Sequence, residues 1–187
     1  MKKQFLVDMD GLLTDFLAGA MNMMNIAHGT NFQPAEYAKL WGRFDINEFY
    51  GVSEEEFRHI LSYDDKFWEH LKPTAYGLKL YFWLNRIAPV TIVTSPTSCQ
   101  DAPAQKLRWL QHYLKIKAND VVLCYKKHLL AGNGILIDDL LENVNNFIAA
   151  GGEAILVPSE WNTPNVTFKM VVNTISQNKS IQQWMNK

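Results

Sequence analysis

The chain has 187 residues, of which 48% are hydrophobic and 20% are charged, a composition that is typical of a folded globular protein. Its 18 basic and 19 acidic residues leave a formal net charge of −1, which argues against binding of polymeric nucleic acid through a basic surface. The length fits one domain with a sizeable core and leaves room for an inserted subdomain.

The first predicted element is a buried strand over Phe5–Met9, because this run is short, apolar and free of turn signals. It brings Asp8 and Asp10 to its carboxyl end, where Gly11 allows a sharp turn. Two carboxylates this close raise each other's pKa, so a metal ion or a proton is the expected partner. The same pattern also occurs in ordinary turns, which leaves a purely structural role open. A calcium loop is disfavoured, because the residues that follow lack its regularly spaced oxygen ligands.

After this strand the sequence indicates a run of helices without a strand. A helix is predicted from Asp15 to about His28. Further helix starts, one with a proline in the first turn and one with a capping box, lie at Asn31–Tyr37, Ser53–Glu56 and Tyr63–Asp65. A structureless loop of this length would be anomalous in a compact domain. We therefore expect a small helical cap over residues 17–73, inserted into a catalytic core made of residues 1–16 and 74–187.

Beyond residue 74, short apolar segments alternate with helical patterns. The predicted strands are Val90–Thr94, Asp120–Leu123, Gly134–Ile137 and Ala154–Val157. The predicted helices are Tyr76–Arg86, Ala102–Leu114, Leu140–Ala149 and a last helix from Ser176 to the C-terminus. Continuous apolar strands separated by helices predict a parallel sheet that is covered on both faces. The expected fold class is α/β, with a Rossmann-like sheet flanked by helices.

Further polar residues lie at or near the ends of these strands. Thr94-Ser95 ends one strand, Asp138-Asp139 follows another, and Lys126-Lys127 precedes the latter. Each group alone has an ordinary explanation as a turn, a helix cap or a solvated pair. Their joint occurrence with the first Asp pair is much less expected by chance, and the carboxyl ends of parallel strands share one crevice.

This crevice would combine two kinds of side chain. Asp8, Asp10 and Asp138 offer the hard oxygen ligands that Mg²⁺ prefers. Thr94 and a lysine are suited to the oxygens of a phosphate group. The spacing itself does not decide between Lys126 and Lys127.

The cysteines and the N-terminus bear on location. Cys99 and Cys124 form no Cys-x-x-Cys motif and no metal-binding spacing, which suits reduced thiols in the cytosol. Met1-Lys2-Lys3 resembles the start of a signal peptide, but Asp8 and Asp10 interrupt the apolar run behind it. We therefore expect a cytoplasmic protein that does not bind a membrane.

Taken in order, these motifs resemble those of the haloacid-dehalogenase-like phosphatases. That superfamily has Asp-x-Asp-Gly, then a strand-end Thr or Ser, then a Lys, then paired Asp residues after an apolar strand. The corresponding residues here are Asp8-Met9-Asp10-Gly11, Thr94, Lys127 and Asp138-Asp139. Lys127 is preferred to Lys126 because its distance to Asp138 fits the family better.

The resemblance narrows to the 5'(3')-deoxyribonucleotidases of bacteria and bacteriophages. The segment Asp8–Phe16 resembles their opening Asp-Met-Asp-Gly-Val-Leu-Ala-Asp-Phe. The segment Phe67–Pro73 resembles their Phe-Trp/Phe-x-x-Leu-x-Pro motif, although the Pro-Gly that often follows is replaced by Thr74-Ala75-Tyr76-Gly77. The likeness covers about Phe5–Asn162, nearly the whole chain.

This resemblance implies a mechanism. Asp8 would attack phosphorus and form an aspartyl-phosphate, and Asp10 would act as general acid and then as general base. Mg²⁺ would be held by Asp8, by the backbone carbonyl of Asp10 and by Asp138. Stabilising and supporting roles would fall to Thr94, Lys127, Asp139 and Ser95. A carboxylate at position 10 favours phosphate-ester hydrolysis over dehalogenation or ATPase chemistry.

The expected substrate is a deoxyribonucleoside 5'(3')-monophosphate, and the alternative is another small phosphorylated metabolite such as a sugar phosphate. Aromatic residues of the cap are candidates for stacking on a base, although such residues are more often core. They are Phe16, Trp41, Phe44 and Trp68. The expected partner is thus a small-molecule nucleotide, and the oligomeric state, a homodimer included, is left open. A non-catalytic phosphate binder is disfavoured, because every catalytic residue type is present.

Overall fold

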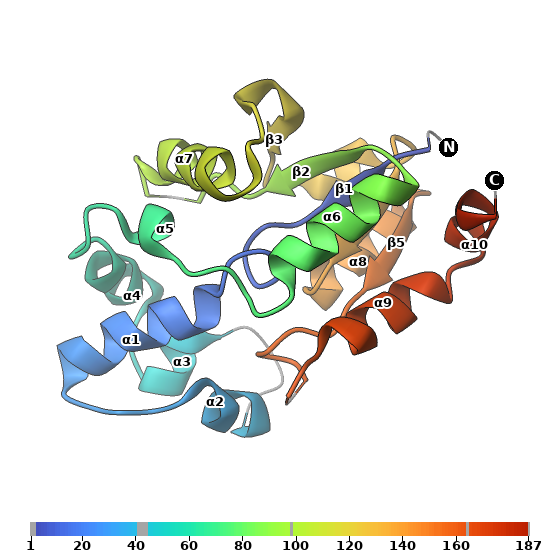
Figure 1. The fold of residues 1–187 in the computed structure, drawn as a ribbon. Coiled ribbons are helices and arrows are strands. Elements are labelled where there is room, and N and C mark those ends of the chain that lie inside the picture. The colour runs from blue at the N-terminus through green and yellow to red at the C-terminus, as the bar shows by residue number, and fades with distance from the viewer. Residues whose placement is uncertain (1–2, 41–44, 98, 164, 187) are drawn as a thin grey trace.

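The computed structural model describes residues 3–40, 45–97, 99–163 and 165–186. These residues form a sheet with the strand order β3-β2-β1-β4-β5, in which all neighbouring strands are parallel (Figure 1). The strands are β1 (Phe5–Val7), β2 (Val90–Thr94), β3 (Val121–Leu123), β4 (Ile135–Asp138) and β5 (Glu153–Leu156). The predicted α/β class with a Rossmann-like parallel sheet is confirmed.

Helices connect the strands and follow the last strand at the C-terminal end. In the described part of the chain they are α1 (Phe16–His28), α2 (Pro34–Leu40), α3 (Ile46–Tyr50), α4 (Glu54–Leu61), α5 (Phe67–His70), α6 (Gly77–Ile87), α7 (Ala102–Leu114), α8 (Leu141–Ala149), α9 (Phe168–Ser176) and α10 (Lys179–Met185). Two short 3₁₀ helices, η1 (Ala118–Asp120) and η2 (Lys127–Leu130), flank β3. The alternation of helix and strand after residue 74 follows the predicted order.

Both faces of the sheet are buried. Phe5 and Val7 of β1 pack in one cluster with side chains of α6, α7, α9 and α10. Leu6 points to the opposite face and packs with Phe147 of α8. Because successive residues of a strand point to opposite faces, a strand covered on both sides must be apolar throughout, as β1 is.

The helices α1 to α5 form a separate group beyond the carboxyl ends of the strands (Figure 1). Their buried side chains make an apolar cluster of their own, which includes Phe16, Met24 and Trp68. Asp15 caps α1 by accepting a hydrogen bond from the Ala18 N–H, and Ser53 caps α4 in the same way. This group lies where the helical cap was predicted, and the division of the chain at residues 17 and 74 stays a prediction.

Two side chains of α7 connect this group to the core. The side-chain amide of Gln105 accepts a hydrogen bond from the backbone N–H of Trp68 at 3.0 Å and donates one to the backbone carbonyl of Asp65 at 2.9 Å. The Trp109 indole donates to the Leu71 carbonyl at 2.7 Å. Both side chains are buried, so these hydrogen bonds fix α5 against α7 away from water.

The C-terminal region differs from the sequence-based expectation. The predicted last helix is present, but it starts at Lys179 and not at Ser176, because Ser176 ends α9. The Asn178 side chain accepts a hydrogen bond from the Ile181 N–H, which starts α10 afresh. Helix α9 was not predicted at all, nor was the short α3.

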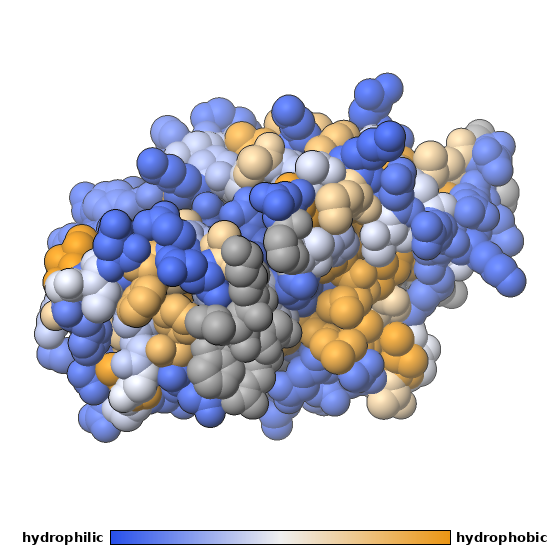
Figure 2. Space-filling model, turned by 90° about the horizontal axis from the view of Figure 1, so that it is seen from below, coloured by the Kyte–Doolittle hydropathy of each residue, from blue (hydrophilic) through white to orange (hydrophobic). Residues whose placement is uncertain are grey.

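No helix among the described residues is long and apolar enough to cross a membrane. Hydrophobic side chains nevertheless gather on the face that Figure 2 shows, on the side where α9 lies in Figure 1. Leu156 and Met170, which are partly exposed, line an open pocket together with Trp161. Asp139, which directly follows β4, also borders this pocket.

Candidate active site

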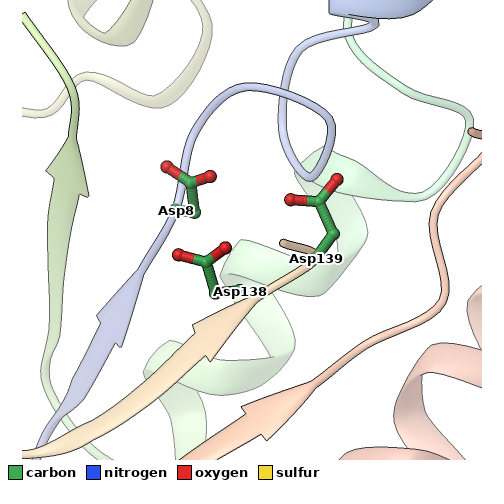
Figure 3. Close-up of side chains that lie close together, drawn as sticks. All are labelled: Asp8, Asp138 and Asp139. Atoms are coloured by element: carbon green, nitrogen blue, oxygen red, sulfur yellow. The ribbon is translucent and has the colours of Figure 1, made fainter. Parts of the chain in front are cut away.

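Three buried carboxylates meet at the carboxyl ends of β1 and β4. Asp8 follows β1, Asp138 ends β4 and Asp139 comes directly after it (Figure 3). One oxygen from each carboxylate lies within 4.8 Å of the other two. All three side chains are buried, so their charges repel one another with little screening by water.

Lys127 compensates part of this charge. Its Nζ lies 2.7 Å from Asp8 Oδ1 and 2.7 Å from Asp138 Oδ2. Burial lowers the pKa of the Lys127 ammonium, but the two carboxylates outweigh burial and raise the pKa above its usual range. An ammonium has three N–H donors, and these two contacts leave one for a ligand in the cavity that Lys127 lines. Lys126 is exposed and also lines that cavity, so the structure sets the two lysines in different surroundings.

Asp138 is held more firmly than its neighbours. Its Oδ1 accepts a hydrogen bond from the Leu140 N–H at 2.9 Å. The Asn143 amide of α8 lies 3.2 Å from Oδ1 and 3.1 Å from Oδ2. Together with Lys127, these donors fix the orientation of a carboxylate that is fully buried.

Lys127 does not compensate all of the negative charge, and the pKa values of Asp8 and Asp139 are raised. Burial raises the pKa of Asp8 to about 7, with further upward contributions from Asp138 and Asp10 and an opposing one from Lys127. Burial and the charges of Asp8 and Asp138 raise the pKa of Asp139 well above its usual range. Carboxylates whose pKa values are raised by burial and by one another are suited to a divalent cation, which would neutralise their charge.

Asp139 occupies space that only glycine at position 11 leaves open. A Cβ atom on Gly11 would lie 2.2 Å from Asp139 Oδ2, and the Gly11 backbone has a φ of +83°. Asp139 Oδ2 also accepts a hydrogen bond from the Trp161 indole at 2.7 Å. The Asp-x-Asp-Gly motif therefore shapes the site through its glycine as well as through its acids.

We expect Gly11→Ala to destabilise the protein by about 1–3 kcal/mol, the range for a residue held in strained backbone. The added methyl group would also displace the Asp139 carboxylate from the acidic cluster. Urea denaturation of the two proteins measures the difference in unfolding free energy. The control is Gly132→Ala, because Gly132 also has a positive φ (+88°) but open space around its Cβ position. Equal losses in both variants would contradict a specific clash with Asp139.

Asp10 lies beside the acidic cluster and has different partners. Its Oδ1 accepts a hydrogen bond from the Thr14 hydroxyl at 3.2 Å, and its Oδ2 is paired with the ammonium of Lys106. The Lys106 Nζ also donates to Thr94 Oγ1 at 3.1 Å and to the Ser95 carbonyl at 2.8 Å. The carboxylate of Asp10 is therefore bound to a cation of α7 and is not part of the three-carboxylate cluster.

Lys106 is a residue that the sequence-based reasoning missed. It is fully buried, which is rare for lysine unless it is paired. A signal was present, because Lys106 falls on the apolar stripe of α7 with Ala102, Trp109 and Leu110. A charged residue on the buried face of a helix indicates a buried partner, but not which one.

A cavity of about 400 Å³ opens over these residues. Of the predicted site residues, it is lined by Asp8, Asp10, Phe16, Ser95, Lys127 and Asp139. Thr94 and Asp138 are fully buried and do not line the cavity, although Asp138 is bonded to Lys127, which does. Other lining residues, which the sequence did not single out, include Tyr125, His128, Asn146 and Trp161.

Of the four aromatic side chains predicted to stack on a base, the structure describes two, Phe16 and Trp68. Phe16 borders the cavity, whereas Trp68 is buried in the cluster of α1 to α5 and packs against Phe16 and Phe67. Trp41 and Phe44 lie outside the described residues. A role of these four side chains in substrate binding stays a prediction.

Several solved structures with a similar fold are haloacid-dehalogenase-like hydrolases. One is a hydrolase of family IA, variant 3, from Entamoeba histolytica HM-1:IMSS, with 18% identity, a TM-score of 0.55 and coverage of 96% of this chain and 90% of that one. A hydrolase from Streptococcus pneumoniae TIGR4 has 15% identity and a TM-score of 0.59, over 95% of this chain and 98% of that one. At these identities the likeness establishes the fold.

A third similar structure was solved with bound phosphate and sodium. It is a hydrolase of the same superfamily from Deinococcus radiodurans R1, with 15% identity and a TM-score of 0.55 over 84% of this chain and 82% of that one. None of the curated proteins compared with the chain matches it.

The sequence itself matches a family model over residues 2–177, which is almost the whole chain. The model describes the family "5' nucleotidase, deoxy (pyrimidine), cytosolic type C protein". The match agrees with the acidic cluster, the buried lysine and the sheet that carries them. The protein is therefore a phosphatase with the haloacid-dehalogenase-like fold, and it belongs to this nucleotidase family.

Proposed function

We propose that this phosphatase removes the phosphate group from deoxyribonucleoside 5'(3')-monophosphates in a Mg²⁺-dependent reaction with an aspartyl-phosphate intermediate. The observation that supports this most is the placement of Asp8. Its carboxylate follows β1, lines a cavity of about 400 Å³ and lies 2.7 Å from the ammonium of Lys127. A nucleophilic carboxylate needs such a cation nearby, because it must approach a phosphate group of the same charge.

In the first step Asp8 attacks phosphorus and the bond to the leaving oxygen breaks. Lys127 still has an N–H donor for a phosphoryl oxygen, and its charge opposes the negative charge of the transition state. The Thr94 oxygen accepts a hydrogen bond from Lys106, which leaves the Thr94 hydroxyl hydrogen to donate to the phosphate.

Asp10 moves the protons of both steps. It lines the cavity beside Asp8, and in the first step it protonates the leaving oxygen of the nucleoside. In the second step it takes a proton from the water that attacks the aspartyl-phosphate. One group serves both steps, because the acid of the first step becomes the base of the second.

The side chains present fit a divalent metal ion. Asp8, Asp138 and the backbone carbonyl of Asp10 would hold Mg²⁺, and Asp139 lies within reach of the same point. These are hard oxygen donors with more negative charge than Lys127 offsets, which is the donor set that Mg²⁺ prefers. When bound, the ion neutralises charge on the phosphate and on the attacking carboxylate.

Mg²⁺ is expected to stabilise the folded protein, since the cluster does not exist in the unfolded chain. An ion present at about 100 times its Kd adds about 2.7 kcal/mol, which raises the Tm of a chain of this length by roughly 5–10 °C. Asp138→Asn should lose most of this shift, whereas the exposed Asp120→Asn should keep it. Thermal denaturation with Mg²⁺ or with EDTA measures both. A full shift in Asp138→Asn would contradict the assignment of the cluster as the metal site.

The substrate class rests on the family and on the cavity. The family description names a deoxy, pyrimidine nucleotidase, and the cavity beside Asp8 has room and an aromatic side chain, Phe16, for more than a phosphate group. A base could stack on such a ring, which contributes about 1–3 kcal/mol. We expect a single nucleotide in this cavity, because the chain lacks the basic surplus that binding of a polymer requires.

A substrate panel tests this proposal. It contains dUMP and dTMP with the phosphate at the 5' or the 3' position, the purine deoxyribonucleotides, the matching ribonucleotides and several sugar phosphates. We expect the highest kcat/KM for deoxyribonucleotides. Equal or higher values for sugar phosphates would replace the nucleotide assignment by the alternative, a phosphatase for another small metabolite.

A further inference from the structure

Lys106 is a buried ammonium that none of the steps above uses directly. Its three N–H donors go to Asp10 Oδ2, to Thr94 Oγ1 and to the Ser95 carbonyl, the last at 2.8 Å. These contacts use every hydrogen of the ammonium, so it has none left for a substrate. Lys106 is also absent from the residues that line the cavity.

The comparison with Lys127 shows the difference in role. Lys127 forms two such contacts, lines the cavity and keeps one donor free for a phosphoryl oxygen. Lys106 is enclosed, and the rigid helix α7 carries it. Its position is fixed from the side of β2, because Thr94 and Ser95 are the last residue of that strand and the first one after it. A cation whose position is fixed in this way also fixes the carboxylate of Asp10, with which it forms an ion pair.

The proposed role of Asp10 requires a side chain that is held in one orientation. A carboxyl group that is to protonate a leaving oxygen must lie within hydrogen-bond reach of that oxygen. Free rotation about χ1 and χ2 would lower the fraction of time that the group spends in this position. Two partners hold the side chain, the Thr14 hydroxyl on Oδ1 and the Lys106 ammonium on Oδ2. Because Lys106 belongs to α7, the pair binds the Asp10 carboxylate to that helix, whereas the cluster of Asp8, Asp138 and Asp139 does not include Asp10.

We propose that Lys106 is a positioning residue that holds Asp10 for proton transfer to and from the leaving group. This inference rests on the proposed function, because it takes Asp10 to be the general acid. No bond to Lys106 forms or breaks in the reaction. The protonated carboxyl group of Asp10 gives its proton to the leaving oxygen as that oxygen separates from phosphorus. The carboxylate that this leaves stays paired with Lys106, which fixes where it lies.

The dependence of the rate on the leaving group tests this role. An alkyl phosphate such as dTMP needs a proton on its leaving oxygen, whereas 2,4-dinitrophenyl phosphate releases a stable anion and needs none. The ratio kcat/KM covers the reaction up to departure of the leaving group, so it reports the step in which Asp10 is the acid. A defect confined to Asp10 will therefore appear with the first substrate and be nearly absent with the second.

For Lys106→Met we expect kcat/KM for dTMP to fall on the order of 10²-fold, the lower end of the usual contribution of general acid catalysis. With 2,4-dinitrophenyl phosphate it should fall no more than about 3-fold, since Asp8, which attacks, and Lys127, which binds the phosphate, have no contact with Lys106. Lys115→Met, an exposed lysine at the end of the same helix, should change neither value. Equal losses for the two substrates, or no loss for either, would overturn the proposal.

A double-mutant cycle with Asp10→Asn gives a second measurement. If Lys106 acts through Asp10, Lys106→Met will cause no further loss of dTMP hydrolysis once Asp10 is Asn. A full additional loss in the double variant would show that Lys106 acts elsewhere. Lys106→Gln, which keeps uncharged donors for Thr94 and Ser95, takes the place of Lys106→Met if that variant does not fold, with the same split between the substrates expected.

Failure of the proposed function can be told apart from failure of this inference. If the wild-type protein prefers sugar phosphates to dTMP, the nucleotide assignment fails, and the comparison is repeated with the preferred alkyl phosphate. The difference between the losses of kcat/KM that Lys106→Met causes with the alkyl and with the aryl phosphate then decides the role of Lys106 by itself.

Discussion

Asp8→Asn should lower kcat on the order of 10⁴-fold or more, since loss of a covalent nucleophile removes the main reaction path. The amide is almost the same size as the carboxylate but is too weak a nucleophile to displace the leaving oxygen. Folding should be retained, because the change removes one of the three carboxylates of the buried cluster, and Asp138 still pairs with Lys127. Steady-state kinetics and thermal denaturation measure the two effects.

The identity of the nucleophile can also be read directly. Acid quenching of the wild-type protein during turnover, followed by digestion and mass spectrometry, should find a phosphoryl group on the peptide that contains Asp8. The control Asp120→Asn changes an exposed aspartate and should leave kcat at the wild-type value. A phosphorylated peptide from any other part of the chain, or wild-type turnover by Asp8→Asn, would refute Asp8 as the nucleophile.

Lys127→Met should affect both stability and catalysis. Removing one partner of a buried ion pair costs about 3–5 kcal/mol of unfolding free energy, because the other charges stay buried without compensation. Here two carboxylates, Asp8 and Asp138, lose their cation together. The loss should also raise the pKa of Asp8, since Lys127 is the group that lowers it.

In catalysis the same change removes a donor and a charge from the transition state, so kcat/KM should fall by about 10²–10³-fold. Lys126→Met is the matched control, because the neighbouring lysine is exposed, and surface changes of this kind shift stability by about 0.5 kcal/mol or less. Urea denaturation without metal and kinetics with Mg²⁺ measure the two variants. If Lys126→Met is the more damaging one, the phosphate-binding lysine has been assigned to the wrong neighbour.

The sheet and most of its connections could be predicted from the sequence. Strands that are buried on both faces must be continuously apolar, and Phe5–Val7 and Ile135–Ile137 carry this pattern without interruption. Helix α9 was missed because Val171, Val172, Thr174 and Ile175 are β-branched, and such residues have low helix propensity. Packing of Val171 and Ile175 in the core outweighs that local preference.

The acidic and basic residues at strand ends could likewise be predicted, because parallel topology brings these ends together. The tie between Lys106 and Asp10 could not, because the two residues are 96 positions apart and no local pattern links them. The contact between Gly11 and Asp139 was equally hidden in the sequence, since a glycine in a turn has many ordinary explanations.

The hydrogen bonds of α7 to the backbone around α5 have a consequence for local opening of the molecule. The amide hydrogen of Trp68 is bonded to the buried side chain of Gln105, so it can exchange with solvent only when α5 separates from α7. Helix α5 is thus part of the same cooperative unit as the core, although its residues belong to the predicted cap. Helix α4, with its exposed polar face, can open without that separation. Hydrogen exchange would then draw the boundary between core and cap on the N-terminal side of α5, several residues before the end of the cap that the sequence predicts.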